Sequence, residues 1–251
     1  MIDLAGKRAV VTGGSRGIGA ATAIQLARAG ADVCIGYRQR STEANDVVRH
    51  IRDLGRRAMA VPGDLSRRED AERLLATAGQ ELGGLEIFIG NAGIWPSDAV
   101  AIETMDDERW ARTMRENVDS VFFTTRAAAR TMASGGRIVL VSSTAGQRGE
   151  SFHADYAASK GAMISYVKSL AIELAPRDIT VNAVAPGWVD TEMVTPALAA
   201  GGRDAIAATI PLQRLATADD IAGPIVFLCS PLARHITGEV LNVNGGSVLC
   251  G

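Results

Sequence analysis

The chain has 251 residues, of which 47% are hydrophobic and only 4% aromatic, and its formal net charge is −2. This length suits one large α/β domain, and the absence of a basic stripe argues against nucleic acid as a partner. No apolar run approaches the roughly 20 residues of a membrane span and the first residues lack a signal-peptide layout, so we expect a cytoplasmic protein without membrane contact.

Short apolar runs alternate with longer amphipathic stretches along the sequence. In chain order, strands are predicted at 8–12, 32–36, 57–61, 86–89, 137–142, 179–185 and 240–243. Helices are predicted at 17–29, 42–54, 67–82, 106–117, 120–133, 155–174 and 218–229. This alternation predicts a doubly wound parallel sheet with helices on both faces, a Rossmann-type α/β fold, in a single domain over 1–251. The irregular stretch 186–215 is long enough to be a substrate lid.

A glycine-rich turn joins the first predicted strand to the first predicted helix. Its sequence is Thr12-Gly13-Gly14-Ser15-Arg16-Gly17-Ile18-Gly19. Glycine lets the backbone approach a pyrophosphate closely, and a helix N-terminus offers free N–H groups and partial positive charge. A simple tight turn would also explain the glycines, but their position at the first crossover favours nucleotide binding. The candidate cofactor-binding residues here are Gly13, Ser15, Arg16, Gly17, Ile18 and Gly19.

The end of the second predicted strand indicates which nucleotide is bound. An acidic residue at this point usually holds the ribose 2′-hydroxyl of NAD, but the sequence here is Gly36-Tyr37-Arg38-Gln39-Arg40. An arginine suits a 2′-phosphate through a charge-assisted contact, and Arg16 could flank the same group. We therefore predict NADP(H), with Tyr37 and Arg38 at the site; the alternative is that Arg38 and Arg40 are simply exposed.

Tyr156 and Lys160 open the long helix predicted at 155–174. Residues four apart share a helix face, and a lysine ammonium favours the phenolate, so it lowers a tyrosine pKa toward neutrality. The chain has three tyrosines and three lysines, which makes a coincidental pair at this spacing uncommon. Tyr156 is thus the candidate general acid or base, with Lys160 as its electrostatic partner.

Other polar residues follow strands that end at the same edge of the sheet, where ligands bind in parallel α/β folds. Ser142 and Ser143 end one strand, and either hydroxyl could face the crevice or close a turn. Asn91-Ala92-Gly93 follows another strand. Asn117 lies inside a predicted helix, where asparagine is a mediocre helix former, so its amide is expected to bond to backbone or water.

Taken together, these motifs resemble the classical short-chain dehydrogenase/reductase family over nearly the whole chain. The resemblance implies a seven-stranded Rossmann fold in which Tyr156 exchanges a proton with a carbonyl or alcohol oxygen held by Ser143, preferred over Ser142 by the family's spacing. It implies that Lys160 also holds the nicotinamide ribose and that Asn117 anchors a water in a proton relay. It further implies cofactor contacts from Asp64, Leu65, Asn91, Ala92, Gly93, Tyr156, Lys160, Pro186, Gly187, Val189 and Thr191.

Within that family the chain is most similar to 3-oxoacyl-(acyl-carrier-protein) reductases, through Asp190-Thr191-Glu192-Met193 and Val243-Asn244-Gly245-Gly246. Arg177 matches one of the basic positions that such reductases use for the acidic carrier, but the segment 132–135 lacks the other. Gly90 also replaces an asparagine that is common before Asn-Ala-Gly. The substrate is therefore expected to be a small carbonyl or alcohol compound, with a carrier-bound substrate as the alternative.

The expected pocket lining is Trp95, Phe152, His153, Trp188 and Met193, a mostly apolar set. His153 could contact substrate or be a loop residue. The resemblance also implies a homotetramer. A non-catalytic NADP(H)-binding sensor or scaffold is the competing class, which the complete Asn–Ser–Tyr–Lys set disfavours.

The three cysteines are widely spaced and form no metal-ligand cluster. Cys34 and Cys229 fall in apolar elements and are expected in the core, while the state of Cys250 is open.

Overall fold

A computed structural model describes residues 2–249, except for the side chains at 200 and 201. It contains one seven-stranded parallel sheet in the order β3-β2-β1-β4-β5-β6-β7. The strands are β1 Arg8–Thr12, β2 Asp32–Tyr37, β3 Ala58–Pro62, β4 Ile87–Gly90, β5 Arg137–Val141, β6 Thr180–Pro186 and β7 Val240–Val243. The predicted doubly wound sheet is confirmed, and the order reverses between β1 and β4, which opens a crevice at the carboxyl edge.

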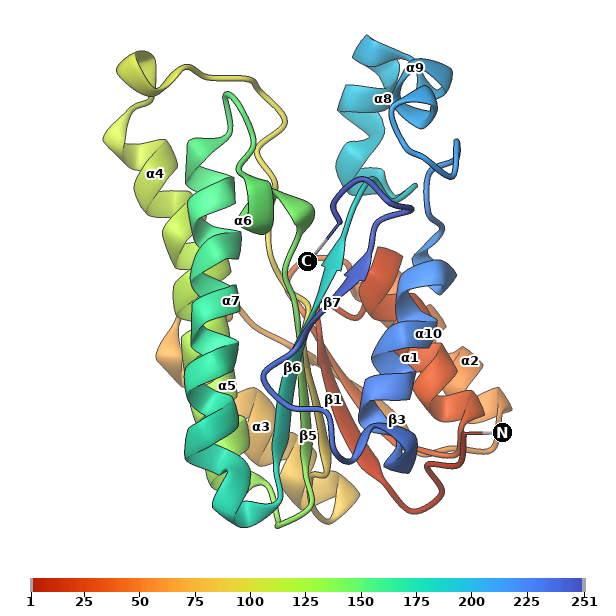
Figure 1. The fold of residues 1–251 in the computed structure, drawn as a ribbon. Coiled ribbons are helices and arrows are strands. Elements are labelled where there is room, and N and C mark those ends of the chain that lie inside the picture. Colours follow the sequence, from red (N-terminus) through yellow and green to blue (C-terminus); the bar gives the residue numbers. More distant parts are fainter. Residues whose placement is uncertain (1, 250–251) are drawn as a thin grey trace.

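Helices cover both faces of this sheet, as Figure 1 shows. The face with α1, α2 and α10 encloses one apolar core, and the face with α3, α5 and α7 encloses the other. The bounds are α1 Gly17–Arg28, α2 Ser41–Asp53, α3 Arg68–Leu82, α4 Asp107–Met114, α5 Ser120–Thr131, α6 Thr144–Arg148, α7 Ala154–Leu174, α8 Thr195–Gly201, α9 Arg203–Ala208 and α10 Ala218–Cys229. Cys34 and Cys229 are buried in these cores, and burial raises both thiol pKa values to about 12. Cys250 lies outside the described residues.

Two sequence predictions of local structure need correction. The predicted helix 106–117 ends as α4 at Met114, and the chain continues through a π-helical turn, Arg115–Asp119, into α5. The stretch 186–215 is not irregular throughout, because it contains a 3₁₀ turn, Glu192–Val194, followed by α8 and α9. These short helices stand above the carboxyl edge of the sheet in Figure 1. We call residues 191–208, which lie within the predicted lid 186–215, the lid. None of the helices in residues 2–249 is both long and apolar enough to cross a membrane.

Candidate active site

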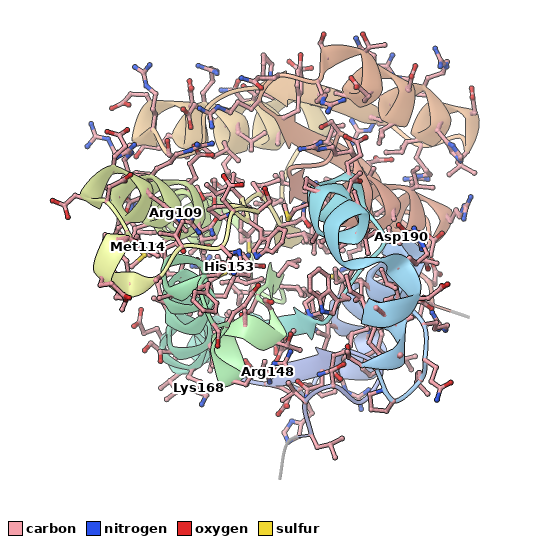
Figure 2. The ribbon with its side chains drawn as sticks, turned by 90° about the horizontal axis from the view of Figure 1, so that it is seen from above. Arg109, Met114, Arg148, His153, Lys168 and Asp190 are labelled. Atoms are coloured by element: carbon pink, nitrogen blue, oxygen red, sulfur yellow. The ribbon has the colours of Figure 1, made fainter. Side chains whose placement is uncertain are left out.

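A cleft opens where the carboxyl ends of β4, β5 and β6 meet the lid. Trp95, Trp188 and Met193 line it as expected. Phe152 does not, because its side chain points outward with 59% of its surface exposed. His153 is buried behind the wall, stacked on Trp95 with ring centres 5.1 Å apart. Seen from above in Figure 2, His153 lies on the α4–α7 side. The cleft is therefore walled by two indole rings, with His153 supporting one of them.

Tyr156 and Lys160 lie on α7 at the floor of this cleft. The Lys160 ammonium donates to the Val141 carbonyl over 2.8 Å and lies 5.8 Å from the centre of the Tyr156 ring. Burial raises the pKa of Tyr156 to about 12, partly offset by a hydrogen bond with Ser143. Burial likewise lowers the pKa of Lys160 to about 8. The lowering of the Tyr156 pKa that was expected from Lys160 is opposed by desolvation, which favours the neutral phenol and raises this pKa in the protein alone.

The two serines that end β5 have different partners. Ser142 is buried and its hydroxyl donates to the Lys160 carbonyl over 2.9 Å, which ties β5 to α7. Ser143 caps α6, where its hydroxyl oxygen accepts from the Ala145 N–H at 3.1 Å, and it is only partly buried at the cleft. Ser143 is therefore the serine whose hydroxyl can reach both Tyr156 and a ligand.

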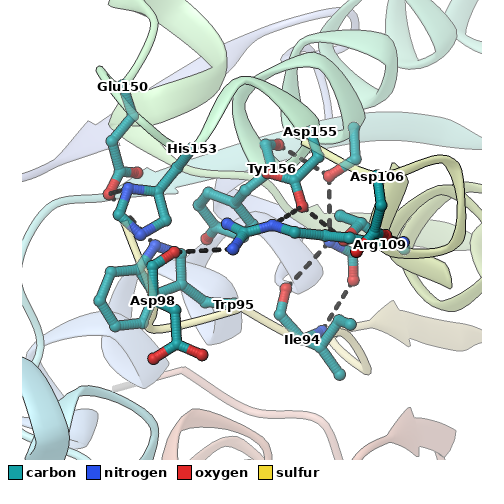
Figure 3. A network of polar contacts seen from close by, with 12 residues as sticks. Ile94, Trp95, Asp98, Asp106, Arg109, Glu150, His153, Asp155 and Tyr156 are labelled. Carbon is teal, nitrogen blue, oxygen red and sulfur yellow. Dashed lines mark hydrogen bonds and ion pairs between the residues drawn. The ribbon is translucent and has the colours of Figure 1, made fainter. Parts of the chain in front are cut away.

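Asn117 lies in the π-helical turn and bonds across the chain rather than along its own helix. Its side-chain oxygen accepts from the Ile94 N–H at 2.7 Å, and its amide donates to the Ile94 carbonyl at 3.0 Å. The amide also donates to the Ser159 hydroxyl, which in turn donates to the Tyr156 carbonyl. Figure 3 shows the hydrogen bonds to Ile94 that belong to this network. The extra residue of a π turn is what aims the Asn117 side chain at the cleft wall.

A second network in Figure 3 fixes the start of α7, and nothing in the sequence pointed to it. The Asp155 side chain is fully buried and accepts from Arg109 at 3.1 Å and from Thr113 at 2.7 Å. Arg109 also donates to the Asp98 carbonyl at 2.7 Å, which holds the segment that carries Trp95. Conventional motifs could not have revealed this pair, because its members lie 46 residues apart.

A groove continues from the cleft across β1 and β2, and the glycine-rich turn forms its floor. Gly13 and Gly17 have φ of +64° and +55°, a region that suits glycine. A Cβ at Gly19 would lie 2.2 Å from the Gly13 carbonyl oxygen, so the turn packs too closely for any side chain there. Asn91 braces it by donating to the Thr12 carbonyl at 2.9 Å. This exposed backbone cradle at the start of α1 fits a dinucleotide phosphate.

Most of the other predicted cofactor residues also line the groove or the cleft. Tyr37 ends β2, Arg38 follows it, and Asp64 and Leu65 follow β3; these residues line the groove. Arg38 pairs with Glu116 at 3.0 Å and with Asp64 at 3.4 Å. The structure places the remaining predicted residues at one or both cavities: Ser15, Arg16, Ile18, Ala92, Gly93, Pro186, Gly187, Val189 and Thr191.

This fold, with a phosphate cradle leading to a partly buried tyrosine and a buried lysine, defines a nucleotide-dependent oxidoreductase class. The family model described as Enoyl-(Acyl carrier protein) reductase matches residues 13–247. A 3-oxoacyl-[acyl-carrier-protein] reductase of Vibrio cholerae is 40% identical over 98% of each chain. An L-rhamnose 1-dehydrogenase (NAD(P)(+)) of Sphingomonas sp. is 39% identical over 97% of this chain and 96% of its own.

A solved structure agrees with these sequence relatives. A short-chain dehydrogenase from Burkholderia cenocepacia, in complex with NADP, has a TM-score of 0.91 and 40% identity, covering 97% of this chain and 98% of its own. The chain belongs to the short-chain dehydrogenase/reductase family and is an oxidoreductase, so the predicted family and fold are confirmed.

Proposed function

We propose that this chain is an NADP(H)-dependent enzyme that interconverts a carbonyl compound and a secondary alcohol, with Tyr156 as general acid or base. The observation that carries the proposal is the Tyr156 phenol, bonded to Ser143 in a cleft with apolar walls and with Lys160 buried behind it. Bound NADP(H) supplies the hydride chemistry. The NADP complex of the Burkholderia cenocepacia relative and the fit of the phosphate cradle support this cofactor.

The chain's own residues then have separable tasks. The Ser143 and Tyr156 hydroxyls both reach the cleft, so together they can hold and orient a substrate oxygen. Tyr156 transfers the proton, and its high pKa keeps it protonated at neutral pH. Lys160 and Asn117 position the tyrosine helix through Val141 and Ile94, and Trp95 and Trp188 exclude water from the reacting carbon.

The Tyr156→Phe variant tests the proton-transfer role. It removes one hydroxyl and keeps the ring, so we expect the rate of NADPH consumption with a panel of ketones, aldehydes and acetoacetyl thioesters to fall by about 10²–10⁴-fold. NADPH binding, followed by fluorescence, should change little. Equal rates for the variant and the wild type would refute the mechanism and favour the sensor or scaffold alternative.

Arg38→Asp tests the cofactor preference. Arg38 lies at the end of β2, where an acid would hold a ribose 2′-hydroxyl, so the substitution should shift the ratio of kcat/KM for NADPH over NADH toward NADH. An unchanged ratio, or equal efficiency of the wild type with both cofactors, would contradict the NADP(H) assignment.

A 3-oxoacyl-carrier thioester is the second candidate substrate, because the Vibrio cholerae relative is a 3-oxoacyl-[acyl-carrier-protein] reductase. Arg177 gives this candidate little support. It precedes β6, at the edge of the sheet opposite the cleft, and its guanidinium bonds to the Ala129 and Met132 carbonyls. Faster turnover of acetoacetyl thioesters than of simple ketones would favour the carrier-bound substrate.

We also propose a homotetramer located in the cytoplasm. Phe122 on α5 and Ile172 on α7 expose 41% and 78% of their surfaces, and these apolar side chains on one face of the molecule support an interface there. Size-exclusion chromatography with light scattering tests the assembly, and a monomer would refute it. Cell fractionation tests the location.

A further inference from the structure

The groove beyond β2 contains a carboxylate that belongs to the lid. Glu192 begins the first turn of the lid and lines the groove opposite the glycine-rich turn. The preceding residue lies close to that turn, since a Cβ on Gly17 would lie 3.5 Å from the Thr191 methyl group. Segments far apart in the sequence therefore meet here, and the side chain of Glu192 is directed at the phosphate end of the groove.

Two arginines of the groove bind this one carboxylate. Arg16, in the glycine-rich turn, lies 2.6 Å from Glu192 Oε2, and Arg40, after β2, lies 3.0 Å from the same oxygen. Two guanidinium groups converging on one oxygen form the arrangement that also suits a phosphate group. In the described groove, the lid thus offers an internal anion to two arginines of the groove that also contains Arg38, the residue expected to hold the 2′-phosphate.

Glu192 differs from Glu116, another carboxylate of the groove, in how firmly it is held. The Glu116 side chain is only 16% exposed, pairs with both Arg38 and Arg112, and sits in the rigid π-helical turn. The Glu192 side chain is 56% exposed on a short lid element. An incoming phosphate can therefore displace Glu192 at little cost, whereas Glu116 stays in place.

We propose that Glu192 competes with the 2′-phosphate of the cofactor for Arg16 and Arg40, and that this lid carboxylate sets how strongly the enzyme prefers NADP(H) over NAD(H). The inference rests on the proposed NADP(H) cofactor and adds a residue that weakens the preference instead of creating it. A cofactor without the 2′-phosphate leaves the pairs with Glu192 intact.

Binding of cofactor fragments tests this without turnover. 2′,5′-ADP carries the 2′-phosphate and 5′-AMP lacks it, so calorimetric titration of both isolates the phosphate contribution. Glu192→Gln keeps the shape and removes one negative charge. Ion pairs between exposed side chains are weak, so this variant should bind 2′,5′-ADP about threefold to tenfold more tightly at low salt. Its affinity for 5′-AMP should stay within about twofold, and high salt should shrink the gain.

Glu43→Gln is the matched control. Glu43 also pairs with Arg40, at 2.8 Å, but it lies on α2 and does not line the groove, so its removal should strengthen 2′,5′-ADP binding less. The inference is overturned if Glu192→Gln leaves 2′,5′-ADP binding unchanged or weaker, if 5′-AMP gains equally, or if Glu43→Gln has the same effect.

The wild type separates this inference from the cofactor proposal. If it binds both fragments equally and only Glu192→Gln gains a preference for 2′,5′-ADP, the NADP(H) preference is wrong and the role of Glu192 stands. If the wild type prefers 2′,5′-ADP and the variant matches it, the preference stands and the role of Glu192 is wrong. If neither protein prefers 2′,5′-ADP, both are wrong.

Discussion

Gly146 is the point at which α6 packs against the backbone of α7, and replacing it with alanine should couple a packing defect to a loss of catalysis. A Cβ at this position would lie 2.5 Å from the Lys160 carbonyl carbon and 2.7 Å from the Gly161 nitrogen. Both atoms belong to the backbone, so no side-chain rotation relieves the contact. Since real Cβ contacts are not shorter than 3.0 Å, α6 must move by about half an ångström or more.

The size of the effect follows from this displacement. Overpacking a tight contact costs about 1–3 kcal/mol, and each kcal/mol lowers the Tm of a domain of this size by about 2–4 °C. We therefore expect Gly146→Ala to lose about 2–12 °C. Because α6 begins at the Ser143 cap, the Ser143 hydroxyl moves away from Tyr156 as well. A misplacement of about 1 Å costs about 10²-fold in rate, so kcat/KM should fall about tenfold.

Thermal unfolding and NADPH-consumption kinetics measure both effects, and Gly223→Ala in α10 is the control. The Cβ built at Gly223 is 3.9 Å from its nearest neighbour, the Gln25 side-chain oxygen, so alanine fits and should stabilise the helix by about 0.5–1 kcal/mol. A Gly146→Ala protein with wild-type Tm and activity would refute the reasoning. Equal losses in Gly223→Ala would show that the close contact with α7 is not the cause.

Two further substitutions probe buried charge. Burial lowers the Lys160 pKa from 10.5 to about 8, so the unfolded chain binds more protons between these values, and this group makes the fold more stable as pH rises through that window. Between pH 8 and pH 10, urea titrations should show the free energy of unfolding of the wild type rising by about 1–2 kcal/mol more than that of Lys160→Met. An equal change in both proteins would contradict the lowered Lys160 pKa. Arg109→Met strands the buried Asp155 carboxylate and should cost about 3–5 kcal/mol. Adding Asp155→Leu to Arg109→Met should restore most of the lost free energy of unfolding, because no unpaired buried charge remains. Chemical denaturation of the wild type and both variants measures this. A double variant no more stable than Arg109→Met would show that the loss does not come from the unpaired Asp155 carboxylate.

The sheet was predictable because its strands are buried on both faces. Parallel strands such as β4 and β5 are nearly continuous apolar runs, so their composition marks them as strands. Predicted ends differ by a residue or two, as at β4, which ends at Gly90 instead of Ile89. The glycine there has a packing reason, since a Cβ at Gly90 would lie 2.6 Å from the Leu140 side chain.

The shorter elements were not predictable because tertiary contacts stabilise them. The helix α6 has five residues, too few to be stable alone, and it forms against α7 where Gly146 permits close approach. The π-helical turn depends on Asn117 bonding to Ile94, 23 residues away, which no local pattern encodes. For the same reason, the sequence predicts that the Asn117 side chain bonds to backbone or water, but it does not predict that the partner is Ile94.

The spacing of Tyr156 and Lys160 on α7 predicts that their side chains are neighbours. It does not predict their pKa values, because these depend on how far the surrounding residues exclude water. Desolvation disfavours the charged form of each group. It raises the pKa of Tyr156 to about 12, so the phenol stays neutral at neutral pH, as it also is in water, and it lowers the pKa of Lys160 to about 8. A neutral phenol can donate a proton and cannot accept one. With the phenol protonated at neutral pH, Tyr156 can donate a proton to a carbonyl oxygen, whereas acting as a base on an alcohol would require that the phenol first lose its proton.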